Sequence, residues 1–233
     1  MSQEHWHRRI LEHRSALFAT LTTVCISIGG LVEIIPMFTV GQGHDEVLPE
    51  PYTPLEVAGR DIYVREGCMT CHSQMVRPFR DETLRYQGDW SHAVEYSWDR
   101  PFLLGSRRIG PDLHRVGGKY SDDWHYRHMK DPRLTDGSIM PAYPWLLEWK
   151  IDPDDVKASV VALSRVGTPY TDEDIANVAT DLQTQGQGIV GRLGEKGIDA
   201  AWDDEIVALI AYLQRLGTDV PKGPVAKAGE VSK

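Results

Sequence analysis

The sequence predicts a mainly α-helical protein in which one membrane-spanning helix precedes a larger helical domain with helical and loop insertions. Three observations lead to this fold class. Residues 15–40 form a continuous apolar run. Near the C-terminus, apolar residues recur at the three- to four-residue spacing of a helix. Two further segments begin with Asp-Pro or Thr-Asp, residues that are typical of helix starts.

The apolar run at 15–40 is long enough to cross a bilayer, which takes roughly 20 helical residues. It contains 26 residues and one charge, Glu33. A cleaved signal peptide is the alternative, but its apolar region is typically about 7–15 residues and ends at a small-residue cleavage site. Neither feature is clear here, so we expect the run to remain as a membrane anchor, with Cys25 as an inert thiol within it.

The flanks of this run predict its orientation. Arginines precede it, whereas acidic residues follow it before the first arginine on that side, Arg60. Basic residues favour the cytoplasmic side, so we expect a cytoplasmic N-terminus and a periplasmic C-terminal domain. The arginines are Arg8, Arg9 and Arg14, and the acidic residues are Asp45, Glu46, Glu50 and Glu56.

Glu33 is an ionisable group inside the span, which makes it a functional candidate by default. It lies in the outer third, three residues before Pro36, where its carboxylate can reach the interface or freed backbone groups. We expect that structural role, with a partner-subunit contact or a proton-linked role as the alternative.

Residues 41–57 mix Gly, Pro and acidic residues without periodicity and predict an extended linker. A helix should begin at Pro54 or Leu55 and end at Glu66, before Gly67. The last residues should form a loose tail. The expected divisions are an N-terminus at 1–14, an anchor at 15–40, a linker at 41–57, a domain at 58–217 and a tail at 218–233.

Cys68, Cys71 and His72 form the pattern Cys-x-x-Cys-His, the attachment signature of a covalently bound c-type haem. The thiols bond the haem vinyl groups, and the histidine is the proximal iron ligand. Half of a zinc site or a redox dithiol is the alternative. The remaining cysteine, Cys25, lies in the apolar run, and no βαβ pattern surrounds the motif. We therefore expect one covalently bound haem c.

The segment 203–217 predicts a helix with one apolar face. Ile206, Ile210, Leu213 and Leu216 recur at helical spacing, and Gly217 is a typical C-terminal cap. In cytochromes c, a helix before the haem motif crosses one near the C-terminus. This resemblance implies a class I-like cytochrome c domain here, with Gly59 and Tyr212 at the crossing.

Met140, in a loop before Pro141, is the expected sixth iron ligand. Its position, after the helix expected at 124–130 and an Asp-Pro turn, resembles that of the axial methionine in class I cytochromes c, and Met/His ligation raises the haem potential. Met75 is too close to the motif to reach the opposite face, and Met129 should face the core. The alternatives are His92, His114, His125 and His128.

Gly110-Pro111-Asp112-Leu113 resembles another cytochrome c element, in which the proline packs near the proximal imidazole. The ring N–H of a ligating histidine is commonly held by a backbone carbonyl, so Pro111 belongs to the expected haem surroundings. Arg107 and Arg108 precede this element. Guanidinium groups match carboxylates, so we expect at least one of them to pair with a haem propionate, with surface solvation as the alternative.

Two segments exceed what a small cytochrome c needs. Residues 76–105 are rich in aromatic residues among charges and suit an interaction surface or a cover over the haem edge, with a local satellite core as an equal alternative. Helix-start residues predict added helices at about 153–166 and 172–193. The aromatic residues are Tyr86, Trp90, Tyr96, Trp98 and Phe102.

The formal charge of the chain is -9, from 34 acidic and 25 basic residues. Nucleic-acid phosphates attract a basic face, so we expect no nucleic-acid partner.

Taken together, these stretches resemble the membrane-anchored mono-haem subunit, subunit II, of cbb3-type cytochrome c oxidase. The similarity covers nearly the whole chain. It is carried by EIIP at 33–36, YVREGCMTCHSQM at 63–75, GSRRIGPDL at 105–113 and SIMPAYPW at 138–145.

The resemblance implies a location in the inner membrane of a bacterium and electron transfer from a dihaem cytochrome c subunit III to the catalytic haem–copper subunit I, which reduces oxygen to water. This chain would not itself carry the oxygen-reducing site. A free-standing, membrane-tethered electron carrier is the alternative.

Overall fold

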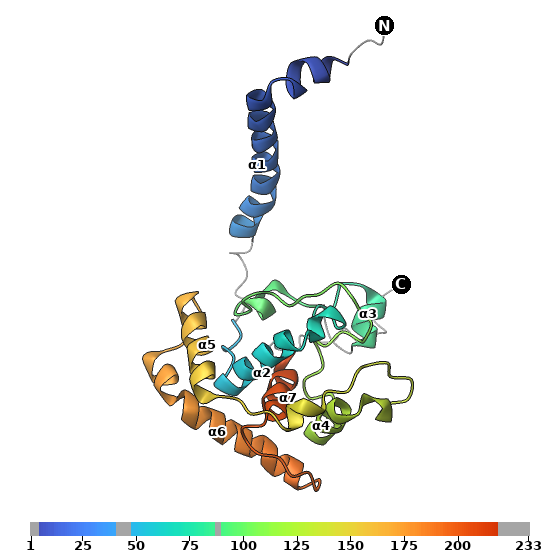
Figure 1. The fold of residues 1–233 in the computed structure, drawn as a ribbon, viewed down its shortest axis with the longest axis vertical. Helices are drawn as coiled ribbons and strands as arrows, with labels where there is room; N and C mark the ends of the chain where they lie inside the picture. Colours follow the sequence, from blue (N-terminus) through green and yellow to red (C-terminus); the bar gives the residue numbers. More distant parts are fainter. Residues whose placement is uncertain (1–4, 41–47, 87–89, 219–233) are drawn as a thin grey trace, which may run out of the picture. The chain divides into compact units, whose positions relative to one another are not determined.

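The computed structural model of the 233-residue chain describes residues 5–40, 48–86 and 90–218. The chain divides into two units, with the boundary between Val47 and Leu48. The chain is mainly helical, with 58% of its described residues in helices, and the described residues form no strand (Figure 1). The predicted fold class is confirmed.

The first unit consists mainly of helix α1, Ser15–Val40. Its Ser15–Ile35 part has a mean hydropathy of 1.9 and is long and apolar enough to cross a membrane. Two hydroxyl groups inside the span are satisfied by the helix itself. Thr20 and Thr23 each donate to a backbone carbonyl one turn earlier, at 2.9 Å. The predicted helix at 15–40 is confirmed, whereas residues 1–4, 41–47 of the linker and 219–233 of the tail lie outside the described residues.

The centre of the second unit is the crossing of α2, Pro54–Arg65, with α7, Glu205–Arg215. Helix α2 begins where the sequence predicts, because Glu56 accepts a hydrogen bond from the backbone N–H of Thr53 at 2.8 Å. Gly59 lets the two helices touch. A Cβ atom there would lie 2.7 Å from the carbonyl carbon of Ala208 and 2.8 Å from Cβ of Tyr212. The predicted contact of Gly59 with α7 is confirmed.

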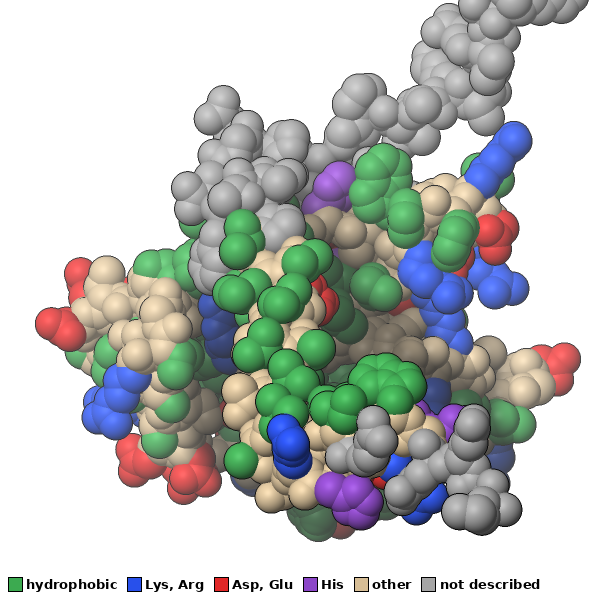
Figure 2. All heavy atoms as spheres, turned by 90° about the horizontal axis from the view of Figure 1, so that it is seen from above, with side chains coloured by type: hydrophobic (Ala, Val, Ile, Leu, Met, Phe, Trp, Pro, Cys, Tyr) green, Lys and Arg blue, Asp and Glu red, His purple; other side chains and the backbone are tan. Residues whose placement is uncertain are grey.

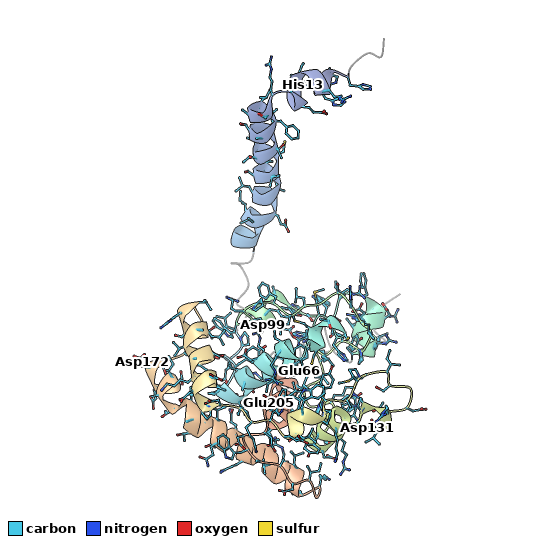
Figure 3. The ribbon with its side chains drawn as sticks, in the orientation of Figure 1. His13, Glu66, Asp99, Asp131, Asp172 and Glu205 are labelled. Carbon is cyan, nitrogen blue, oxygen red and sulfur yellow. The ribbon has the colours of Figure 1, made fainter. Side chains whose placement is uncertain are left out.

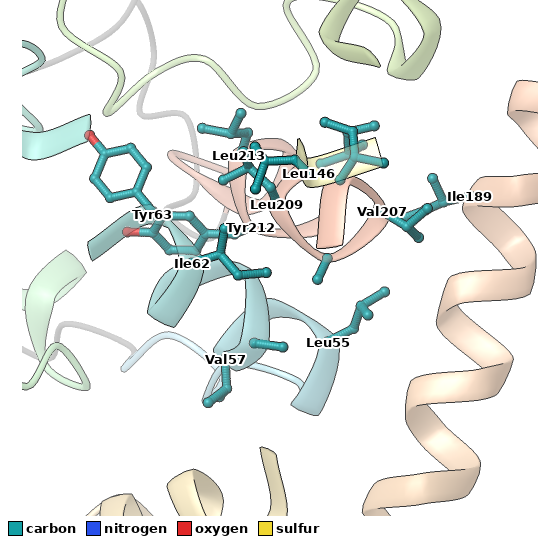
Figure 4. Packing of buried hydrophobic residues seen from close by; sticks show 14 of the residues in the cluster. Leu55, Val57, Ile62, Tyr63, Leu146, Ile189, Val207, Leu209, Tyr212 and Leu213 are labelled. Carbon is teal, nitrogen blue, oxygen red and sulfur yellow. The ribbon is translucent and has the colours of Figure 1, made fainter. Parts of the chain in front are cut away.

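The hydrophobic core surrounds this crossing (Figure 4). Tyr63 of α2 and Tyr212 of α7 meet edge to face, with ring centroids 5.4 Å apart. Leu55, Leu209 and their neighbours are fully buried around them. This core therefore holds together two segments that lie about 150 residues apart in the sequence, near the two ends of the domain.

The two added helices extend the same core. Helix α5 spans Pro153–Arg165 and helix α6 spans Asp172–Gly194, and both pack on α2 (Figure 1). The side chains of Asp152 and Thr171 cap them, so the predicted helix starts are confirmed. Helix α4, Asp122–Lys130, packs against α6 and α7 and bears out the helix predicted at 124–130.

Residues 48–57 belong to the second unit. Leu55 and Val57 are buried in α2, and earlier residues of this segment are bound to the domain. Trp98 donates from its ring nitrogen to the carbonyl of Pro49 at 2.6 Å, and Tyr52 donates to Asp99 at 3.0 Å.

The segment 76–105 contains a short helix α3, Arg80–Arg85, and a 3-10 turn η4, Ala93–Tyr96. Its aromatic residues divide between the inside and the surface. Tyr86 and Tyr96 are buried, whereas Trp90 and Phe102 are 43% and 60% exposed. The buried tyrosines match the expected satellite core, whereas the interaction surface stays a prediction.

Candidate haem site

The two cysteines and His72 lie on one turn at the C-terminal end of α2. Gly67 ends the helix with a φ of 72°, a left-handed conformation that glycine adopts without strain. The chain then forms the 3-10 turn η3, Cys68–Thr70, and His72 closes it by donating its backbone N–H to the carbonyl of Cys68 at 2.9 Å. Burial, with a further contribution from Glu66, raises the pKa of the Cys68 thiol to about 12.

The imidazole of His72 is held by the element at 110–113. Its Nδ1 lies 2.7 Å from the carbonyl oxygen of Pro111, as the sequence predicts for a histidine oriented by a backbone carbonyl. Gly110 packs against the ring so closely that a Cβ atom would lie 2.7 Å from Nδ1 and 2.8 Å from Nε2. Because Nδ1 is bonded to the carbonyl and Nε2 has no hydrogen-bond partner in the described part of the chain, Nε2 is the nitrogen that fits a haem iron.

Met140 lies on the loop between α4 and the 3-10 turn η6, Pro144–Leu147. Met140 and Cys68 are both partly buried against the same core. The backbone N–H of Tyr143 donates to the carbonyl of Met129 at 2.8 Å, which fastens the loop to the end of α4. Burial, together with nearby Cys68 and Cys71, raises the pKa of Tyr143. The loop that carries Met140 thus returns to the attachment turn.

The four histidines that compete with Met140 occupy different surroundings. Nε2 of His114 lies 2.6 Å from the carboxylate of Glu95. His125 is 2% exposed, and burial lowers its pKa to about 4. His92 stacks on Trp90 at 5.3 Å. His128 stacks on Trp124 at 4.5 Å, and burial, followed by the nearby His72, lowers its pKa. His128 is therefore the main competitor of Met140, and Met129 faces the core as predicted.

Arg108 donates hydrogen bonds to several protein groups. It donates to Ser73 Oγ at 2.7 Å and to Glu82 and the carbonyl of Met75 at 2.8 Å each. These partners lie 26 to 35 residues before Arg108 in the sequence and were not predicted from it, whereas the pairing of a propionate with Arg107 or Arg108 stays a prediction. Arg107 is exposed and has no ion pair within the described ranges, so it is the arginine of the two that suits a propionate.

Two buried carboxylates lie behind His72 and were not predicted from the sequence. The side chain of Asp112 is fully buried and accepts from Ser73 Oγ at 2.6 Å and from the backbone N–H of Met75 at 2.8 Å. Glu82, on α3, accepts from Arg108 and Arg77, and these hydrogen bonds outweigh burial and hold its pKa at about 2. Only the position of Asp112, next to Pro111, was a signal in the sequence.

A further polar cluster closes the site where α2 ends. Arg65 donates to both oxygens of Glu205 at the start of α7 and also to Glu66, and Figure 3 shows these two glutamates close together near the middle of the domain. Trp145 of η6 donates to Glu66 at 3.1 Å. Glu66, just before the attachment turn, is thereby connected to the C-terminal helix through Arg65 and to the Met140 loop through Trp145.

A cavity of about 410 Å³ opens beside the loop that holds His72. Three cationic side chains contribute to its wall, and in Figure 2 basic side chains gather on the side of the domain where Figure 1 places α3. The lining residues are Arg85, Tyr86, Arg108, Ile109, Gly110, Pro111 and Lys119.

These features define a membrane-anchored helical protein with one candidate haem site. A family model described as cytochrome c oxidase, mono-haem subunit/FixO, matches residues 7–220, which include both the anchor and the described domain. The chain belongs to this family, the mono-haem subunits of cbb3-type cytochrome c oxidase, as the resemblance of its motifs predicts. A search of curated proteins found no match.

Proposed function

We propose that this chain relays electrons through one covalently bound haem c, from a dihaem cytochrome c subunit to the catalytic haem–copper subunit of the oxidase. The observation that carries the proposal is the orientation of His72. Its Nδ1 is bonded to the Pro111 carbonyl beside the two cysteines, which leaves Nε2 for the iron. Membership in an oxidase subunit family supports the destination of the electrons.

The residues have distinct roles in this proposal. Cys68 and Cys71 hold the haem as thioethers, and His72 and Met140 are its axial ligands. The haem, when bound, supplies a one-electron couple whose potential the Met/His pair raises. Pro111 orients His72, and Arg107 pairs with a propionate.

The location follows from the charges that flank α1. Arginines precede the helix and acidic residues follow it, so the N-terminus is cytoplasmic and the haem domain periplasmic, in the inner membrane of a bacterium. The anchor contacts lipid and the catalytic subunit, where oxygen is reduced.

The experiment that tests this function is the ratio of haem b to haem c, measured by pyridine haemochrome spectra on the protein purified from its own membranes in mild detergent. We expect haem b to accompany haem c, because the catalytic subunit copurifies. Haem c alone, at one per chain, would support the free-standing carrier instead. A chain without covalently bound haem would contradict both functions.

A further inference from the structure

The peptide bond between Pro111 and Asp112 is held from both sides. Its carbonyl accepts from Nδ1 of His72 at 2.7 Å. Its N–H, on Asp112, donates to the hydroxyl oxygen of Tyr86 at 3.1 Å. Because a trans peptide is planar with its C=O and N–H pointing in opposite directions, the Tyr86 contact sets the direction in which the carbonyl faces His72.

The side chain of Asp112 holds the same peptide from a third direction. Its carboxylate is fully buried and accepts from Ser73 Oγ, from the backbone N–H of Met75 and from the backbone N–H of His114, at 2.6, 2.8 and 2.9 Å. Ser73 directly follows the attachment motif, and Met75 lies two residues further along. The carboxylate therefore ties the element at 110–113 to the segment that carries His72.

Helix α3 reaches this peptide through Arg108. The guanidinium lies over the ring of Tyr86, 5.5 Å from its centroid, and donates to Glu82 at 2.8 Å. Glu82 is itself buried, and it accepts from the backbone N–H of Arg77 at 3.0 Å. Glu82 and Tyr86 thus present one face of the segment 80–86 to the loop behind the proximal histidine.

Such a network fixes the positions of its groups more than it stabilises the fold. A buried ion pair contributes little net stability, because desolvation offsets the attraction, but it is costly to break. A fully satisfied polar network also specifies one arrangement, and each hydrogen bond polarises the next. The N–H bond to Tyr86 therefore strengthens the carbonyl as an acceptor for His72.

We propose that the segment 80–86 is a positioning element for the proximal ligand. Tyr86 holds the Pro111–Asp112 peptide directly, and Glu82 holds Arg108 against Tyr86 and Asp112. This inference rests on the proposed function, since it assigns a role in setting the haem potential. Stronger hydrogen bonding to the second ring nitrogen makes an imidazole ligand more basic, which favours oxidised iron and lowers the potential.

The test compares two tyrosine variants in the full chain, purified with its haem in detergent. Tyr86→Phe removes the acceptor of the Asp112 N–H. Tyr96→Phe is the matched control, because Tyr96 is buried in the same segment and its hydroxyl donates to the carbonyl of Gln74 at 2.8 Å rather than bonding the Pro111–Asp112 peptide. Both variants lose one buried hydrogen bond, so a purely structural role predicts similar effects.

We expect Tyr86→Phe to raise the reduction potential and to speed the solvent exchange of the His72 Nδ1 proton, followed by NMR in the reduced protein. Tyr96→Phe should leave both unchanged. Equal potentials in Tyr86→Phe and the wild type would overturn the inference. If Tyr86→Phe does not accumulate, Glu82→Gln decides through the exchange of the His72 Nδ1 proton, because loss of the Glu82 charge alone raises the potential. Faster exchange supports the positioning role, and unchanged exchange refutes it.

The haem content of the wild type separates this inference from the proposed function. A wild type without covalent haem would refute the function itself. Covalent haem with no change of potential in the variant would refute the positioning role alone.

Discussion

Gly59 is the position at which a single methyl group should separate the two central helices. Replacing Gly59 with Ala would place a Cβ atom 2.7 Å from the carbonyl carbon of Ala208 and 2.8 Å from Cβ of Tyr212. The first of these neighbours is backbone, so it cannot rotate away as a side chain would. Helices α2 and α7 must move apart, and the core around Tyr63 and Tyr212 must open with them.

The expected cost is the difference between two opposing effects. Alanine is a better helix former than glycine by about 1 kcal/mol, whereas forcing an extra carbon into a packed core costs about 1–3 kcal/mol and occasionally more. A clash with backbone belongs at the upper end of that range. We therefore expect Gly59→Ala to lower the free energy of unfolding by about 1–2 kcal/mol.

Gly191→Ala is the matched control, because Gly191 lies in helix α6 and a Cβ atom there would meet no atom within 4 Å. This variant gains helix propensity without a clash, so it should be stabilised by up to about 1 kcal/mol. The two variants should therefore differ in stability by about 1–3 kcal/mol. One kcal/mol corresponds to about 2–4 °C in Tm for a domain of this size, so their Tm values should differ by roughly 2–12 °C. Thermal unfolding of the full chain in detergent, followed by circular dichroism, measures this. Equal or higher stability of Gly59→Ala would refute the close crossing.

Three further predictions concern the site and its surroundings. Met140→Ala should retain covalent haem but lower its potential and remove the thioether-to-iron absorption near the red edge, and an unchanged spectrum would eliminate this ligand. Denatured wild-type protein should contain one reactive thiol, Cys25, because Cys68 and Cys71 are expected as thioethers; three reactive thiols would contradict covalent attachment. Although burial opposes ionisation of Glu95, hydrogen bonds from His114 and Arg115 hold its pKa at about 2, so ionised Glu95 adds stability above its usual pKa near 4.5. Wild type and Glu95→Gln should therefore differ less in their free energy of unfolding, measured by denaturant titration, as the pH falls from about 4.5 to 2. A difference that does not depend on pH would contradict the ion pairing of Glu95.

The elements that the sequence predicts well are those with local signals. Helix α7 shows apolar residues at helical spacing, and α5 and α6 begin with capping residues, so their chemistry is contained in a few neighbouring positions. The position of Pro111 against His72 was predicted as well, because the motif and its carbonyl partner resemble a known arrangement. In each of these cases, the residues that allow the prediction lie next to one another in one or two short segments.

The part that the sequence does not predict depends on contacts between distant residues. At least one of Arg107 and Arg108 was expected to pair with a propionate, and that pairing stays a prediction. The bonds of Arg108 to Glu82 and Ser73 were not predicted, because these two residues lie 26 and 35 residues before it and leave no periodic trace in the sequence. Helix α3 has six residues and no repeating apolar pattern, so it was not predicted at all. Whether an arginine meets a cofactor or a buried carboxylate is decided by tertiary packing, which spacing along the chain does not reveal.

The two added segments are attached to the domain by different forces, and this difference suggests different roles. Helices α5 and α6 contribute apolar side chains to the common core, and burial of such surface stabilises the fold in proportion to its area. The segment 76–105 contributes Leu103 to this core and is otherwise fastened mainly by buried polar contacts, which add little net stability but fix relative positions. Those contacts end on α2, on the loop behind His72 and on the residues after Leu113, so this segment constrains the geometry of the haem site while α5 and α6 supply stability. The polar contacts are Arg60–Asp99, Glu82–Arg108, Glu95–His114 and Glu95–Arg115.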